Sequence, residues 1–170
     1  TAFMLYAILG AAGRKPGLLG TIESRIGGEP HPAIRTTPEA IDLQRLFREM
    51  VDAGDTSVAV EASSHGSVLH RLDRVRYDAL VFTNLSQDHL DFHPSMEAYG
   101  EAKALLFTAY APRASVICVD GAFGAALADR AKGDVLRCSV RADSGAPLRV
   151  LAWSMTRTGL RATLLTPDGE

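Results

Sequence analysis

Polar side chains that can bind metals or move protons follow an apolar segment between Phe82 and His93, in the sequence FTNLSQDHLDFH. Carboxylate groups come from Asp88 and Asp91. The spacing of His89 and His93 would place both rings on one face of a helix, a pattern found in zinc sites. Such a cluster is also typical of an ordinary polar loop, so its significance depends on the residues that accompany it.

A proline decides between helix and loop at this position. The ring of Pro94 disfavours helical backbone at His93, the residue before it. We therefore expect the two histidines to lie on a loop. A zinc-dependent hydrolase stays open as an alternative; its ligands would come from His65, His89, His93 and Asp91.

Two further residues give this loop possible partners. Glu61 ends a short apolar run and precedes the polar sequence SSHG. Its carboxylate could bind a hard cation such as Mg²⁺, or could be a hydrogen-bonded structural acid. Lys103 lies within an apolar helical pattern, where a solvated lysine is the ordinary interpretation. Only the combination of Glu61, Lys103 and the loop indicates a metal-assisted active site.

The expected helices and strands place these residues at one edge of a sheet. Helices are predicted over residues 2–13, 37–54, 95–110 and 121–131, the second with Thr37 as its N-cap. Buried strands are predicted over residues 17–23, 57–61, 78–83 and 115–119, with an exposed turn at 27–32 and a hairpin around 158–159. We expect an α/β fold with a mostly parallel sheet flanked by helices and an antiparallel β-hairpin at the C-terminal end. Because ligands of such sheets bind outside the carboxyl ends of the strands, Glu61 and the loop from Asn84 to His93 should lie at the binding edge.

Bulk properties favour a single globular domain of 170 residues, 46% of them hydrophobic. The formal charge of −2 provides no general attraction for nucleic acid or for an acidic membrane surface, and no apolar run is long enough to span a bilayer. Cys118 and Cys138 are the two cysteines, and we expect both to be free thiols in a reducing compartment. A cytoplasmic protein is the expectation, without nucleic acid or membrane as a partner.

Several motifs in order resemble the central domain of the Mur ligases. They are EASSHG at 61–66, HR at 70–71, TNLSQDHLDFH at 83–93 and EAK at 101–103. The segment TTPEAIDLQ at 36–44 makes the chain most similar to the members that add the third amino acid of the peptidoglycan peptide. The similarity covers nearly the whole chain. Residues 1–170 are thereby identified as part of a central, ATP-binding domain of the P-loop type.

This resemblance implies an ATP-dependent amide-bond ligase of peptidoglycan synthesis. In that family ATP phosphorylates a substrate carboxylate, and an amine then displaces phosphate from the acyl phosphate. Cations must offset the repulsion between the carboxylate and the triphosphate. The implied Mg²⁺ ligands are Glu61 and His89. Lys103 is implied to be carbamylated, which turns a cation into an anionic oxygen ligand, and these three residues form the implied catalytic set.

The resemblance also implies the substrates and their contacts. Thr36, Thr37, Ser63 and Arg71 match positions that bind the UDP-N-acetylmuramoyl-dipeptide (UDP-MurNAc-dipeptide). The other implied substrates are ATP and a diamino acid. Arg35 and Leu69 depart from the family pattern, which has asparagine and glutamine at these positions, so contacts with substrate are expected to differ there.

The phosphate loop of the family has no counterpart, since the chain contains no G-x-x-x-x-G-K-[ST] sequence. The expectation is therefore a partial central domain without this loop and without its C-terminal part. It would work with the N- and C-terminal domains of a parent ligase and be inactive alone. A ligase similar to folylpolyglutamate synthase and a noncatalytic binding module are the remaining alternatives.

Overall fold

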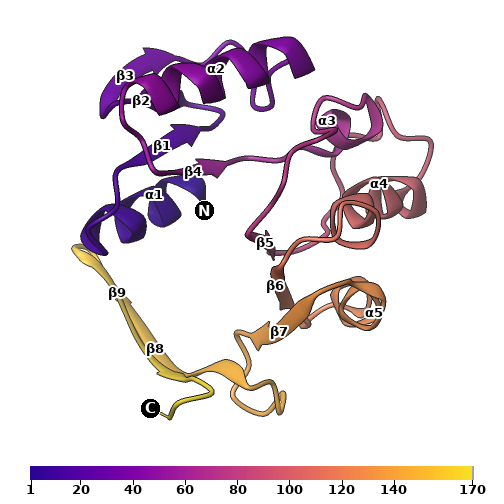
Figure 1. Cartoon of the computed structure of the whole chain (residues 1–170). Coiled ribbons are helices and arrows are strands. Elements are labelled where there is room, and N and C mark those ends of the chain that lie inside the picture. Colours follow the sequence, from indigo (N-terminus) through magenta and orange to yellow (C-terminus); the bar gives the residue numbers. More distant parts are fainter. Residues whose placement is uncertain (170) are drawn as a thin grey trace. The chain divides into compact units, whose positions relative to one another are not determined.

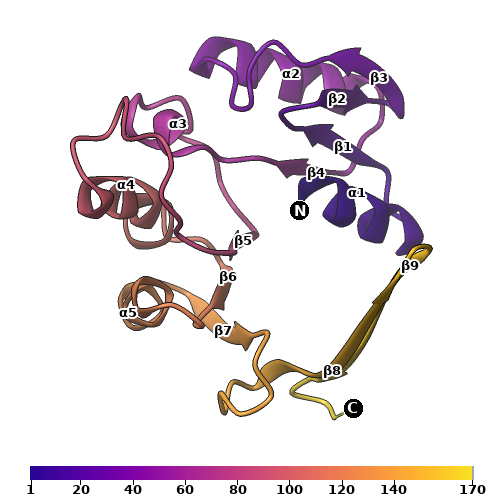
Figure 2. The same ribbon diagram turned by 180° about the vertical axis from the view of Figure 1, so that it is seen from behind.

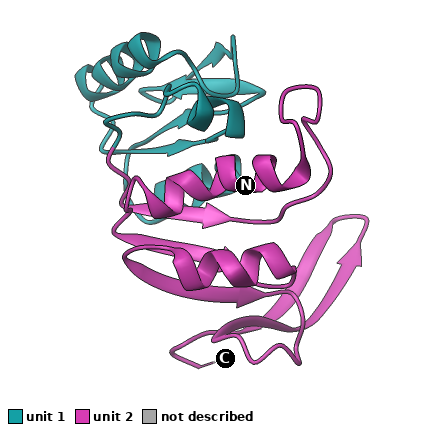
Figure 3. Cartoon of the chain, turned by 90° about the vertical axis from the view of Figure 1, so that its right-hand side faces the viewer, with its two compact units in different colours: residues 1–75 teal, residues 76–170 magenta. Residues whose placement is uncertain are grey.

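The computed structural model describes residues 1–169, and these form two compact units. Unit 1 comprises Thr1–Val75 and unit 2 comprises Arg76–Glu170 (Figure 3). Each unit has its own sheet and its own helices. Within residues 1–169, none of the helices combines the length and the apolar character that crossing a membrane requires.

Unit 1 contains a four-stranded sheet with the order β3-β2-β1-β4 (Figure 1). Its elements are α1 (Ala2–Ala11), β1 (Pro16–Leu19), β2 (Glu23–Ile26), β3 (Glu29–Pro32), α2 (Ala40–Asp52), β4 (Ser57–Val60) and the short α3 (Ser64–Val68). Strands β1 and β4 are parallel, whereas β2 pairs antiparallel with both β1 and β3. The parallel pair has the register Leu19↔Val60, so the residues that follow both strands meet at one edge.

The helices α1 and α2 cover opposite faces of this sheet, as the front and back views agree (Figures 1 and 2). Helix α1 packs on β1 and β4 through Ala2, which meets the buried residues Leu18 and Ala59. A buried helix was predicted here from its continuous apolar sequence. In the structure Ala2 is its only buried residue, while Met4 is 68% exposed.

The turn predicted at residues 27–32 is shorter than expected. Gly27 and Gly28 form it, with φ of 57° and 88°, a region that glycine enters at little cost. Pro30 and Pro32 lie in β3 instead. Strand β3 is at the edge of the sheet, and an edge strand tolerates proline because its outer N–H groups need no partner strand.

Helix α2 begins two residues later than predicted, with Glu39 rather than Thr37 as its N-cap. The hydroxyl of Thr37 donates to the carbonyl of Glu61, and therefore does not cap the helix. The prediction was wrong because the Thr37 hydroxyl bonds to the carbonyl of Glu61 and the N–H of Ser63. Both residues follow β4 in the sequence, 24 and 26 residues after Thr37.

Unit 2 contains a five-stranded sheet with the order β5-β6-β7-β8-β9. Its elements are β5 (Ala79–Phe82), α4 (Met96–Thr108), β6 (Ala114–Cys118), α5 (Ala122–Arg130), β7 (Asp134–Ser139), β8 (Leu148–Thr156) and β9 (Gly159–Leu165). Strands β5 to β8 are parallel, and β8 and β9 form the antiparallel hairpin. These features confirm the predicted fold class, although β2, β3, β7 and α3 were not predicted.

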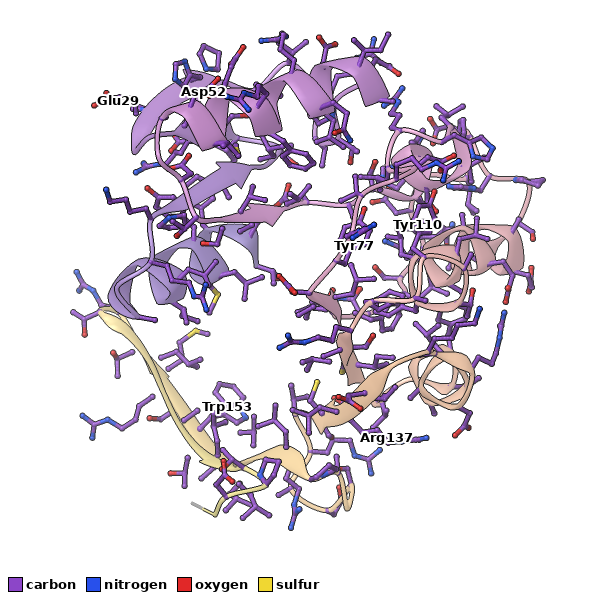
Figure 4. The ribbon with its side chains drawn as sticks, in the orientation of Figure 1. Glu29, Asp52, Tyr77, Tyr110, Arg137 and Trp153 are labelled. Atoms are coloured by element: carbon purple, nitrogen blue, oxygen red, sulfur yellow. The ribbon has the colours of Figure 1, made fainter. Side chains whose placement is uncertain are left out.

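Helices α4 and α5 lie on the same face of the second sheet (Figures 1 and 2). The ring of Phe82 on β5 contacts Phe107 on α4 and Phe123 on α5 at centroid distances of 6.2 and 5.7 Å. Tyr77 and Tyr110 meet edge to face at 6.3 Å beside this core (Figure 4). Aromatic contacts therefore fix α4, which carries Lys103, against the sheet.

The two cysteines face each other across β6 and β7, where Cys118 pairs in register with Cys138. Both are half-buried free thiols, as the sequence predicted. Burial raises the pKa of Cys138 to about 11, so its reactive thiolate form is scarce at neutral pH.

Asp120 joins the carboxyl ends of β6 and β7. Its carboxylate accepts hydrogen bonds from the Ser139 hydroxyl, from the Val140 N–H at 2.9 Å and from the Cys118 thiol at 3.4 Å. Burial alone would raise the pKa of Asp120, but these hydrogen bonds outweigh it and leave the pKa below its usual 3.8. The charged form of Asp120 therefore stabilises the fold.

The substitution Asp120→Asn should lower the free energy of unfolding at neutral pH by about 1–3 kcal/mol, because an amide cannot accept all three bonds. The stability that the carboxylate contributes is present above its usual pKa and is lost as the pH falls through its lowered folded-state pKa. Urea denaturation at neutral and acidic pH measures both effects. Asp129→Asn is the matched control, since it breaks only the exposed pair with Arg137. Equal losses in the two variants would contradict the role of Asp120.

Candidate functional site

Glu61 directly follows β4, so the sheet places its carboxylate at the carboxyl edge. Its Oε2 accepts hydrogen bonds from the backbone N–H of Thr21 at 2.8 Å and from the Thr21 hydroxyl at 2.5 Å. The Thr21 hydroxyl also lies 3.0 Å from that of Thr36. Within unit 1, the hydrogen bonds to this carboxylate end on Oε2, which leaves Oε1 for a ligand.

Thr37 and Ser63 form a second polar group behind Glu61. Thr37 is 1% exposed, and its hydroxyl donates to the Glu61 carbonyl, accepts the Ser63 N–H at 3.0 Å and lies 2.9 Å from the Ser63 hydroxyl. The Ser63 side chain in turn accepts the Gly66 N–H and caps α3. A Cβ on Gly66 would lie 2.7 Å from Thr37 Cγ2, so glycine is needed for this close approach. The Thr37 hydroxyl is fully used inside the protein.

Arg71 is held beside these threonines by two contacts. Its Nη1 donates to the Thr37 carbonyl at 3.3 Å, and its Nη2 lies 2.9 Å from Glu39 Oε1. Only 12% of the Arg71 side chain is exposed. Arg35, which departs from the family pattern, pairs with the same Glu39 oxygen at 3.0 Å but is 55% exposed. Glu39 therefore forms ion pairs with both arginines, next to the predicted substrate residues.

A pocket of about 220 Å³ lies between β3 and α2, and Arg35 and Glu39 are among its lining residues. Ile34 and Leu46 give it an apolar side. Its lining does not include Glu61 or Ser63. The pocket thus adjoins the Arg35–Glu39 pair but is separate from the metal-capable carboxylate.

In unit 2, the residues after β5 form a loop up to Ser95, which caps α4, as Pro94 led us to expect. His89 on this loop has a φ of 54°, a left-handed conformation that is uncommon outside glycine. Its backbone N–H donates to Asp88 Oδ1 at 2.8 Å, and its ring is partly exposed. The ring Nε2 lies 3.6 Å from Asp88 Oδ2, so the neighbouring carboxylate faces the ring.

Lys103 and His89 are both in contact with Tyr99. The Lys103 Nζ lies 4.8 Å from the centre of the Tyr99 ring, and the His89 ring meets the same ring edge to face at 5.7 Å. Lys103 follows Tyr99 by four residues on α4, which places both side chains on one helical face. Tyr99 thus contacts both residues of unit 2 that the sequence singled out.

His93 is 4% exposed and packs against Tyr99 and Phe92 at centroid distances of 5.1 and 4.8 Å. Its position is that of a structural residue. Across the described part of the chain, no three side chains of His, Cys, Asp or Glu are grouped as metal ligands. Of the four zinc ligands considered above, His89, His93 and Asp91 lie in unit 2 and do not form such a group there, and His65 lies in unit 1.

The donors present fit a hard cation that takes few protein ligands. Glu61 offers one carboxylate oxygen, as Mg²⁺ prefers, and phosphate or water would complete its octahedron. Within residues 76–169, no carboxylate lies within ion-pair distance of Lys103, so carbamylation would break no salt bridge there. The lysine would instead lose its cation–π contact with Tyr99.

Three residues of this region were not predicted as site residues. Thr21 follows β1, and Glu61 follows the parallel strand β4; this strand pairing is the signal that could have revealed Thr21. Tyr99 could have been found from its helical spacing to Lys103. Glu39 was assigned to the start of α2, and its ion pairs with Arg35 and Arg71 depend on the fold.

Comparisons with known proteins agree on one family. A sequence profile described as the Mur ligase middle domain matches residues 1–169. A relative from Streptomyces coelicolor named UDP-N-acetylmuramoyl-L-alanyl-D-glutamate--2,6-diaminopimelate ligase is 42% identical over 170 residues, which are 100% of this chain and 33% of the relative. Relatives of the same name from Caldanaerobacter subterraneus and Geobacter metallireducens are 48% and 40% identical, over 82% and 99% of this chain.

A solved structure of a ligase with that name matches with a TM-score of 0.86 at 26% identity, and the match covers 99% of this chain and 35% of that protein. The chain spans about a third of the length of the curated relatives, 29% to 34% in these three. The sequence profile therefore identifies the part of these relatives that the chain matches as their middle domain. The chain belongs to the Mur ligase middle domain family.

Proposed function

We propose that this chain is the middle part of a longer ATP-dependent ligase, hereafter the parent ligase, which adds diaminopimelate to UDP-N-acetylmuramoyl-L-alanyl-D-glutamate. The observation that carries this proposal is the 42% identity over the whole chain to a ligase named for that reaction. The fit of Glu61 to a hard cation supports it. The enzyme would serve peptidoglycan synthesis in the cytoplasm, with ATP, the UDP-MurNAc-dipeptide and the diamino acid as its substrates.

The reaction would proceed in two steps, phosphorylation of a carboxylate and attack by an amine. A carboxylate oxygen of the substrate attacks the γ-phosphorus of ATP, and the bond between this phosphorus and the oxygen that bridges it to the β-phosphate breaks. ADP departs, and the substrate becomes an acyl phosphate. The amine then attacks the acyl carbon, loses a proton and expels inorganic phosphate, so that an amide bond remains. Bound Mg²⁺ would neutralise the charge that develops between the carboxylate and the phosphates.

The residues of unit 1 would hold the substrate and one cation. Glu61 would bind Mg²⁺ through Oε1. Thr36, Ser63 and Arg71 would bind the UDP-MurNAc-dipeptide, with Arg71 beside an anionic group. Because the Thr37 hydroxyl is committed to Glu61 and Ser63, Thr37 would contribute by positioning Ser63.

The residues of unit 2 would serve a second cation. His89 would bind it through a ring nitrogen. The neutral amine of Lys103 would attack CO₂, form a nitrogen–carbon bond and release a proton, and the resulting carbamate would supply anionic oxygens. The contact that each of the two residues makes with Tyr99 supports this assignment.

Product formation by the parent ligase tests the proposal. With ATP, MgCl₂ and the UDP-MurNAc-dipeptide, we expect diaminopimelate to give ADP and one new amide product by mass spectrometry. L-Lysine in place of diaminopimelate is the matched control and should react far more slowly. Glutamylation of a folate without reaction of the UDP substrate would instead favour a folylpolyglutamate-synthase-like activity.

A further inference from the structure

Thr21 is bonded to the carboxylate of Glu61 at two points. The backbone N–H and the hydroxyl of Thr21 both donate to Oε2, at 2.8 and 2.5 Å. The parallel register Leu19↔Val60 places the segments after β1 and β4 side by side, which is why Thr21 reaches Glu61 across 40 residues of sequence. Two donors on one oxygen hold Oε2 against Thr21, so Oε1 is the oxygen that Thr21 does not bind.

The hydroxyl of Thr21 also determines the direction of a hydrogen bond with Thr36. A hydroxyl has one proton, and that of Thr21 is given to the carboxylate of Glu61. At 3.0 Å from Thr36, Thr21 must therefore accept, and Thr36 must donate. The Thr36 oxygen then offers only lone pairs to a ligand, which suits an N–H group rather than a carboxylate.

We infer that Thr21 is a positioning residue that prepares Glu61 for a cation and Thr36 for a ligand N–H. This inference rests on the proposed function, because it assigns a support to the metal ligand named there. Partners behind a metal ligand keep it in its binding orientation, and their loss weakens metal affinity. Thr21 itself contacts neither the cation nor the reacting atoms in this scheme.

The test is a titration of Mn²⁺ alone into the full 170-residue chain labelled with ¹⁵N, because paramagnetic Mn²⁺ broadens the amide signals nearest to it. Signals of Gly20, Thr21 and Glu61 should broaden first, and Glu61→Gln supplies the background. Thr21→Val should require about tenfold more Mn²⁺ for the same broadening, whereas Thr21→Ser, which keeps the hydroxyl, should follow the wild type. Thr163→Val makes the same change at an exposed position of β9 and serves as the matched control.

A Thr21→Val titration that coincides with the wild type would overturn the inference, as would equal weakening in Thr21→Ser. The dispersion of the same spectra reports whether each variant is folded, and Thr21→Ala, which also lacks the hydroxyl, should then weaken binding in the same way. Ligation by the parent ligase together with an unchanged Mn²⁺ titration would reject only the role of Thr21. Weakened Mn²⁺ binding without any ligation by the parent ligase would reject the proposed function and leave the role of Thr21 standing.

Discussion

Replacing Lys103 by alanine in the parent ligase should lower the ligation rate by roughly a hundredfold or more, the scale on which a group that stabilises developing charge contributes. The side chain is half-buried on α4 and rests on Tyr99, which also contacts His89. Its carbamate would supply oxygens to the second cation, and alanine supplies none. Steady-state release of ADP measures the loss, and added formate or acetate should restore part of the activity.

Lys132→Ala is the control for the effect of removing a lysine, because Lys132 is an exposed residue of the same unit. It should leave the rate unchanged. A second measurement detects the carbamate directly: ¹³C-labelled bicarbonate should give a carbamate signal with the wild type and none with Lys103→Ala. Full activity of Lys103→Ala, or the same ¹³C spectrum from Lys103→Ala and from the wild type, would contradict the carbamate.

Replacing Arg71 by alanine should raise the KM for the UDP-MurNAc-dipeptide by about tenfold to a hundredfold, since a hydrogen bond to a charged group contributes about 1.5–3 kcal/mol. The substitution also removes two native contacts, with the Thr37 carbonyl and with Glu39. We therefore expect a lower midpoint in thermal unfolding as well. Arg71→Lys should rescue little of the KM, because an ammonium cannot reproduce the fork of a guanidinium.

Arg35→Ala separates the role of Arg71 from that of the ion pair with Glu39. Both arginines contact Glu39 Oε1, but 55% of the Arg35 side chain is exposed against 12% of Arg71. An exposed ion pair contributes about 0–1 kcal/mol, so Arg35→Ala should change stability and KM only slightly. Equal effects of the two substitutions on KM would contradict a special role for Arg71.

The elements with clear local signals were predicted well. Strands β4 and β5 are short apolar runs, and α4 has helical spacing, so each was expected close to its observed position. Strand β7 was missed because residues 134–139 mix charged and apolar side chains without a simple alternation. The start of α2 was misplaced because Thr37 bonds to Glu61 and Ser63, and no local sequence signal reports such distant partners.

The candidate site shows the same division. Family motifs singled out Glu61, His89 and Lys103, and the pairing of parallel strands explained why Glu61 lies at a sheet edge. The residues that orient them were not apparent. Thr21 reaches Glu61 through the register of two strands, and Tyr99 contacts His89 and Lys103 through the packing of a loop on a helix. Such supports depend on tertiary contacts rather than on spacing along the chain.

Transfer of ¹⁸O from substrate to phosphate tests the central proposal most directly. The UDP-MurNAc-dipeptide, labelled with ¹⁸O in the carboxylate that becomes the amide, is incubated with the parent ligase, ATP, MgCl₂ and diaminopimelate. An acyl phosphate requires one labelled oxygen to leave with the phosphate, so inorganic phosphate should carry one ¹⁸O for each amide formed. Unlabelled phosphate accompanied by amide product would contradict the proposed ligase mechanism.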